Sequence, residues 1–329
     1  MKRRTLLQAT SAAIITAPFT SWAQNYPDKP IRFIVPYPPG GPLDASARAL
    51  AEAVRSSLGT VAVENRTGAG GNIGADAIAK AAPDGYTIGI GAVATHAINP
   101  WLFPKMPYDA LADFTPITLI ANVPNVLILN TDFSSKNNIQ SVADLVKLLK
   151  ARPGKINFGS GGPGSGGHLA GELFKQGAEV FMLHIAYRGA APAQLGLLSG
   201  EVELMFDNLA SAAPRIREGK VKALAVTTRQ RSSQFPDLPS IAESGIPGFK
   251  EFDVSTWFGV FGPAALPRPI LDRLNRELTT ALRSPALRDL MAKQAAEPAP
   301  TTPEQFAQLV ARENKKYEIV VKRSGAKLE

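Results

Sequence analysis

The residues best suited to chemistry lie in a glycine-rich stretch near the middle of the chain. Ser160, Ser165 and His168 occur there close together. A serine beside a histidine can act as nucleophile and general base when a carboxylate orients the imidazole. The G-x-S-x-G pattern of a nucleophile elbow fails at both serines, because Phe158 stands two residues before Ser160 and Pro163 two residues before Ser165. We therefore favour a loop whose hydroxyls and N–H groups hold a ligand carboxylate or amide at a helix start. A serine hydrolase using Ser165 and His168 remains the alternative.

A second loop of unusual composition runs from Pro36 to Asp44, between a strand predicted at 31–35 and a helix predicted at 45–58. Its prolines remove backbone donors, and its glycines let a ligand approach closely. With Asp44 as the helix N-cap, the loop presents free N–H groups at the positive end of a helix, which suits a small anion. A tight turn without a ligand is the other interpretation. The residues predicted to line a site here are Tyr37, Pro39, Gly40, Gly41, Pro42, Leu43 and Asp44.

Metal and cofactor chemistry has little support. The chain has three histidines, His96, His168 and His184, and they are scattered, so no metal site is expected. We interpret His184, inside an apolar strand, as a core histidine. Residues 68–74 have the spacing G-x-G-G-x-x-G, which departs from the dinucleotide fingerprint G-x-G-x-x-G, and we expect no cofactor. The interspersed charges argue against a nucleic-acid partner.

The first residues predict export. A basic start at residues 1–4 precedes an apolar run over 6–19, and Ser21, Trp22 and Ala23 form a small-x-small cleavage site. We expect a signal peptide at residues 1–23 that is cleaved after Ala23. General and twin-arginine export both remain open. Because the chain has no cysteine, disulfides and thiol nucleophiles are excluded.

Alternating strands and helices must position these loops, and they predict right-handed βαβ units in an α/β fold. Three further polar segments follow predicted strands: Thr95 with His96, then Tyr187 with Arg188 and Gly189, then Asp207. Arg188 could pair with a ligand carboxylate or order its own loop. We interpret Asp207 as a helix cap or loop organiser. The predicted strands lie at 31–35, 60–64, 86–91, 155–158, 180–185, 202–206 and 222–226.

The mature chain is long enough for two lobes. Two apolar strands at 114–119 and 126–129, separated by 121–125, indicate a crossing from one lobe to the other, and the Pro- and Ser-rich stretch 230–248 indicates the return. Loops from both lobes would then meet in a cleft, where small-molecule sites often occur. The expected division places 24–122 with 231–329 in lobe 1 and 123–230 in lobe 2.

Taken together, the motifs resemble the Bug-type extracytoplasmic solute receptors, the binding-protein component of tripartite tricarboxylate transporters. The resemblance covers essentially the whole mature chain. One departure is Thr67, where the family usually has proline after Asn-Arg. The motifs that carry the resemblance are Tyr37-Pro38-Pro39-Gly40-Gly41 with Asp44, Val63-Glu64-Asn65-Arg66 before Gly68-Ala69-Gly70-Gly71, Asp84-Gly85-Tyr86-Thr87, Gly162-Pro163-Gly164-Ser165 with His168-Leu169, Tyr187-Arg188-Gly189, Leu238-Pro239-Ser240-Ile241-Ala242-Glu243, and Trp257.

The resemblance implies a periplasmic, non-enzymatic binding protein of the two-lobed type II fold, with a hinge that closes on the ligand. It implies a small carboxylate-bearing solute, membrane transporter subunits as partners, and a monomer. A receptor that feeds a sensor kinase is the other possibility, and the particular acid stays open. Carried over to this chain, one wall is formed by residues 37–43 with Thr95 and His96. The other wall comprises Ser160, Gly161, Ser165, Gly166, His168, Tyr187, Arg188 and Gly189.

Overall fold

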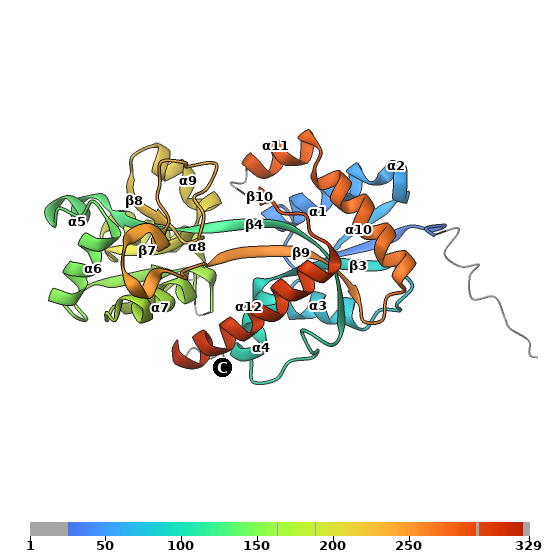
Figure 1. The fold of residues 1–329 in the computed structure, drawn as a ribbon, viewed down its shortest axis with the longest axis horizontal. Coiled ribbons are helices and arrows are strands. Elements are labelled where there is room, and N and C mark those ends of the chain that lie inside the picture. The colour runs from blue at the N-terminus through green and yellow to red at the C-terminus, as the bar shows by residue number, and fades with distance from the viewer. Residues whose placement is uncertain (1–25, 163, 188, 294–295, 325–329) are drawn as a thin grey trace, which may run out of the picture.

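The computed structural model describes residues 26–162, 164–187, 189–293 and 296–324. The predicted signal peptide at 1–23 and Arg188 therefore lie outside the described residues. Within the described ranges, no helix is both long enough and apolar enough to cross a membrane. Ten strands form one continuous sheet with two differently organised parts, which we call the first and the second half (Figure 1).

The first half is built on parallel strands β2, β1 and β3, and β9 pairs antiparallel with β3. Apolar side chains of β1 and of the α1 face pack together, as the helical spacing of Ala47, Leu50 and Val54 predicts. The strands of this half are β1 (Ile31–Val35), β2 (Val61–Asn65), β3 (Thr87–Ala92) and β10 (Glu297–Pro298). Its helices are α1 (Pro42–Ala53), α2 (Arg55–Leu58), α3 (Asn72–Ala79), α4 (Asn99–Leu102), α10 (Arg268–Leu282), α11 (Pro285–Lys293) and α12 (Pro303–Ser324).

The second half repeats the strand–loop–helix pattern. Strands β6, β5 and β7 are parallel, and β7 and β8 each pair antiparallel with β4. Ser141 and Asp144 form a capping box at the start of α6. The strands are β5 (Asn157–Ser160), β6 (Leu183–Ala186), β7 (Leu204–Asn208) and β8 (Val221–Val226). The helices are α5 (Thr131–Lys136), α6 (Val142–Ala151), α7 (Gly166–Ala178), α8 (Ala190–Ser199) and α9 (Leu209–Arg217).

Two long strands, β4 (Phe114–Asn130) and β9 (Ser255–Pro263), join the halves and run side by side in Figure 1. The predicted break of β4 at 121–125 is wrong, because one strand of 17 residues runs through it. Residues 121–124 pair with β9, and pairing with β7 begins at Asn125. The polar residues that suggested a loop are therefore held in extended backbone by partners on both sides.

Each half has its own apolar cores. Side chains of β1, β3, β9 and α10 pack in the first half, and those of β5, α6 and α7 pack in the second. Phe235 and Leu238 contact one core of the second half, while Phe249, Phe252 and Val254 lie inside the other. We therefore propose that the return between lobes is β9 itself, some residues after the predicted return at 231.

Candidate ligand-binding site

Four helices begin just after strand ends, and their N-termini carry most of the predicted site. β1 leads into α1, β5 into α7, β6 into α8 and β7 into α9. The β5 and β6 loops lie together, since Tyr187 N donates to Ser160 O at 3.0 Å and Gly189 N to Gly161 O at 3.2 Å. Unpaired N–H groups and the helix dipole favour an anion at each such end.

Asp44 organises the loop at 36–44 but is not the helix cap that the sequence suggests. Gly41 holds the N-cap position without a side-chain cap, and Asp44 lies inside the first turn of α1. Its carboxylate is buried and accepts hydrogen bonds from Gly40 N (2.9 Å), Arg48 Nε (3.0 Å) and Asn65 Nδ2 (2.9 Å). Burial raises the pKa of Asp44, but these hydrogen bonds outweigh it and lower the pKa to about 2. The carboxylate is thus already engaged, so it fixes the loop's shape.

Tyr37 belongs to this loop and lies next to Gly71 and Thr95, in the segments that follow β2 and β3. A Cβ built on Gly71 would lie 2.8 Å from Thr95 Cγ2 and 3.2 Å from the Tyr37 hydroxyl, so the three residues meet. The hydroxyl of Tyr37 is buried beside Thr95, and burial raises its pKa. Thr95 is buried and bonds within its own turn, from Oγ1 to Ala92 O at 3.1 Å.

The ring of His96 faces the core instead of the loop. It stacks on Phe261 with centroids 4.0 Å apart, and Nδ1 lies 2.9 Å from Thr95 Oγ1. Burial lowers the pKa of His96 to about 3, so the ring is neutral at pH 7. The backbone of this residue is held by Asn314, whose Nδ2 donates to His96 O at 2.8 Å.

In the second half, Ser160, His168 and His184 form one buried cluster behind the loop at 160–168. Ser160 Oγ lies 2.7 Å from His184 Nε2, and the rings of His184 and His168 stack at 4.0 Å. His168 Nδ1 accepts from Gly164 N at 3.0 Å. Burial lowers the pKa of His168 to about 3 and that of His184 to about 4, so both rings are neutral at pH 7. The prediction of a core histidine at 184 is wrong, because His184 is hydrogen-bonded and stacked but only half-buried on the edge strand β6.

The geometry does not form the hydrolase relay of Ser165 and His168. Ser165 Oγ accepts from the backbone N of His168 at 3.3 Å, as the N-cap of α7. The imidazole of His168 points elsewhere, with Nε2 3.9 Å from Glu172 Oε1. Among the described residues, no carboxylate is hydrogen-bonded to His184, the ring that does meet a serine.

Asp207 is the loop organiser that the sequence suggests. It is buried and accepts from Gln194 and from Asn208 N at 2.8 Å, and burial raises its pKa. Asn208 caps α9 through Ala210 N. Tyr187 is partly buried, and burial together with the neighbouring Glu201 carboxylate raises its pKa to about 12.

Sequence reasoning missed Asn125 and Thr256 on the joining strands. A Cβ built on Gly166 would lie 3.3 Å from both Asn125 Nδ2 and Thr256 Oγ1, so both side chains reach the start of α7. Asn125 is buried and its Nδ2 has no partner. The signal was an amide directly before the apolar run 126–129, where a buried polar group needs a partner.

The two halves also touch each other at the loop 160–168. Gly164 lies so close to Leu102 of α4 that an added Cβ would collide with its side chain. The predicted site residues thus fall into two groups, one in each half, and this contact lies between the halves. The first group comprises Tyr37, Gly71 and Thr95, and the second comprises Gly161, Ser165, Gly166 and Gly189. Three surface hollows are lined by residues other than these.

Two α/β halves joined by two strands, with helix starts between them, define a two-lobed binding protein of type II fold. The model of the tripartite tricarboxylate transporter family receptor matches residues 46–326. The chain belongs to this family of non-enzymatic solute receptors, which confirms the resemblance seen in the sequence.

Curated and solved relatives agree. The chain is 41% identical to protein BugT of Bordetella pertussis, over 97% of this chain and 96% of that one. It is 35% identical to Rhodopseudomonas palustris Rpa4515, solved with adipate, with TM-score 0.76 over 92% of this chain and 100% of that one. It is 32% identical to MatC of the same organism, solved with bound malate, with TM-score 0.72 over 90% and 100% of the chains.

Proposed function

We propose that this protein is exported to the periplasm, captures a small carboxylate-bearing organic acid between its halves and delivers it to a tripartite tricarboxylate-type transporter. Family membership and the relatives solved with adipate and with malate support the carboxylate class. In this proposal the signal peptide is cleaved after Ala23, and a monomer hands its ligand to membrane subunits. A receptor that reports to a sensor kinase is the alternative partner.

The observation that supports the proposal best is the unpartnered Nδ2 of Asn125 beside the α7 N-terminus. A buried amide N–H without a partner is destabilising by about 1–3 kcal/mol, so a bound carboxylate that accepts from it would relieve this penalty. The N–H groups that begin α7 would add charge-assisted hydrogen bonds to the same group.

The opposite wall supplies fewer donors. Pro42 has no N–H, and Gly40 N already donates to Asp44. The hydroxyl of Tyr37 is a buried polar group on this wall, so we expect it and ordered water to complete the site. Closure of the halves around β4 and β9 would then bury the ligand, as hinge proteins do.

Thermal unfolding of the mature protein with a panel of organic acids tests the proposal. Adipate, L-malate, citrate, glutamate, benzoate and nicotinate cover the open classes. An acid at about 100 times its Kd should add about 2.7 kcal/mol of stability. The proposal is wrong if no organic acid gives saturable stabilisation.

A pair of variants localises the binding. Asn125→Asp replaces the free N–H by a negative charge and should weaken binding of the best acid at least tenfold. Asn138→Asp, an exposed change in the second half, is the control and should bind normally. Equal affinity in both variants would exclude Asn125 from the site. Loss of uptake in a deletion strain, with normal gene induction by the acid, would separate transport from sensing.

A further inference from the structure

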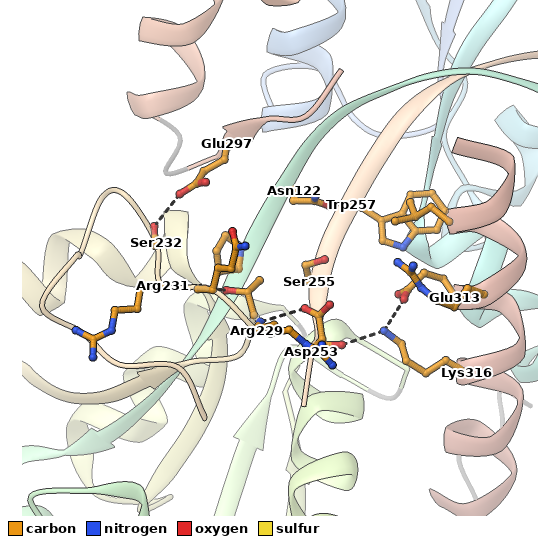
Figure 2. A pocket seen from close by; sticks show the side chains of 15 residues that line it. Asn122, Arg229, Arg231, Ser232, Asp253, Ser255, Trp257, Glu297, Glu313 and Lys316 are labelled. Carbon is orange, nitrogen blue, oxygen red and sulfur yellow. Dashed lines mark hydrogen bonds and ion pairs between the residues drawn. The ribbon is translucent and has the colours of Figure 1, made fainter. Parts of the chain in front are cut away.

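A hollow of about 310 Å³ lies at the junction of the halves and has no role in the function proposed above. Its walls come from β4 and β9, from the segment 228–232, and from α12 (Figure 2). Glu297 of β10 accepts from Ser233 N at 2.8 Å across the rim. Both halves therefore contribute walls to one partly open hollow.

The hollow lies on the opposite face of the joining strands from the predicted ligand loops. Successive residues of a strand point to opposite faces, and directly paired residues share a face. Asn122 pairs with Trp257 and lines the hollow, whereas Asn125 and Thr256 reach Gly166 on the other side. A movement about these strands must therefore change both spaces.

Three polar atoms around the hollow are buried without hydrogen-bond partners: Trp257 Nε1, Asn122 Oδ1 and Glu313 Oε2. Trp257 is 0% exposed and Glu313 is 6% exposed. In Figure 2 the indole of Trp257 lies next to Glu313 along α12. Such atoms are rare in folded proteins, and three of them around one hollow call for an explanation.

The charges around the hollow are mostly paired already. Lys316 Nζ lies 2.7 Å from Glu313 Oε1 and donates to Asp253 O at 3.0 Å, and Arg231 pairs with Glu243. Arg312, also on the wall, has no ion-pair partner among the described residues. The unused groups are thus one guanidinium, one indole N–H and two acceptor oxygens.

We propose that this hollow is a second binding site, for a small carboxylate that carries a hydroxyl or amino donor on the adjacent carbon. The ligand carboxylate pairs with Arg312 and accepts from Trp257 Nε1. The neighbouring donor bonds Glu313 Oε2. Because both halves line the site, its occupancy biases the arrangement of the halves and is coupled to ligand binding on the other face.

L-Lactate and propionate are matched probes, because they differ only in the α-hydroxyl. The mature protein, labelled with 5-fluorotryptophan, carries Trp101 and Trp257, and a Trp101→Phe variant assigns the two ¹⁹F signals. Lactate should shift the Trp257 signal saturably, and propionate should bind about tenfold more weakly, since a hydrogen bond to a charged group is lost. Equal or absent responses to the two probes would overturn the site and indicate trapped water only.

Variants on α12 separate this site from the other. Arg312→Gln should abolish the lactate response, Glu313→Gln should erase the preference over propionate, and Lys315→Gln should change neither. A full lactate response in Arg312→Gln overturns the proposal.

The coupling between the two sites is tested by measuring the affinity of the best panel acid with and without saturating lactate. The coupling is supported if lactate changes the affinity of the unaltered protein for the acid and does not change that of Arg312→Gln. An affinity that lactate leaves unchanged in the unaltered protein overturns the coupling. Stabilisation only by acids with an α-hydroxyl or α-amino group, lost in Arg312→Gln, would refute the transport proposal and leave the second site standing.

Discussion

The two loops expected to face a ligand are built on different physical principles. The first-half loop, residues 36–44, takes its shape from one ionised carboxylate that joins Gly40, Arg48 and Asn65. The second-half loop, residues 160–168, takes its shape from close packing and from neutral imidazoles stacked behind it. A loop held by a charge cluster should tolerate an added methyl group but not the loss of the charge, whereas a packed loop should not tolerate the added methyl group.

The largest difference between the two loops should appear when one methyl group is added to each. A Cβ on Gly167 would collide with the carbonyl oxygen of Phe206, which is backbone and cannot rotate away. Gly167→Ala should therefore lower the free energy of unfolding by about 3 kcal/mol. A Cβ on Gly41 would have Pro38 O as its nearest atom, at 3.7 Å, so Gly41→Ala should change the free energy of unfolding little. Urea unfolding of both variants measures this difference, and equal effects would refute the distinction.

Removing the charge should affect only the first-half loop. Because the folded pKa of Asp44 is about 2, below its ordinary 3.8, its contribution exists above pH 3.8 and disappears as the pH falls toward 2. Asp44→Asn should cost about 2 kcal/mol at pH 7 and almost nothing near pH 2. Glu52→Gln, on the exposed face of α1, is the control and should cost less than 0.5 kcal/mol. A pH-independent loss would mean that Asp44 acts by shape alone.

The sequence predicted the elements better than the interactions between them. The helix starts at Ser141 and Pro303 follow from the sequence, because a helix start is a local signal contained within four residues. The role of Asp44 was wrong because its partner Asn65 comes from the next strand, 21 residues away. The meeting of Ser160 with His184 depends on the register of β5 with β6, which no local pattern fixes.

The unbroken course of β4 teaches the same lesson on a larger scale. Asn122, Pro124 and Asn125 together have the composition of a loop, and only pairing with β9 and β7 makes them a strand. The side chains of Asn122 and Asn125, each with an atom that has no hydrogen-bond partner, then point to opposite faces of the strand. Asn122 therefore lines the hollow, and Asn125 reaches the start of α7. Composition identified these residues as exceptional, but tertiary pairing decides what they do.

The stability of the second half should fall in mild acid, because the imidazoles of His168 and His184 are neutral in the folded state. Their folded pKa values, about 3 for His168 and about 4 for His184, lie below the ordinary 6.5. The unfolded chain therefore binds more protons below pH 6.5, and stability falls as the pH drops from 6.5 toward 4. His184→Gln should reduce the loss between pH 7.5 and 5.5 by about 1 kcal/mol. His96 contributes with the same sign, so the difference between variant and unaltered protein is the quantity to compare. An unchanged slope would show that His184 is already solvated.

The smallest expected change in stability comes from removing a helix cap, and it separates a purely structural cap, Ser141, from one that also lies beside the predicted ligand, Ser165. Ser165 caps α7 through His168 N, and Ser141 caps α6 through Asp144 N, so each alanine substitution should cost about 1 kcal/mol or less. The two caps differ in position, because only α7 begins beside Gly166 and the free amide of Asn125. Ser165→Ala should therefore also weaken binding of the best organic acid several-fold, while Ser141→Ala leaves its affinity unchanged. Titration calorimetry on the two variants measures both affinities. Equal affinities would mean that the α7 start shapes the second-half loop without contacting the ligand.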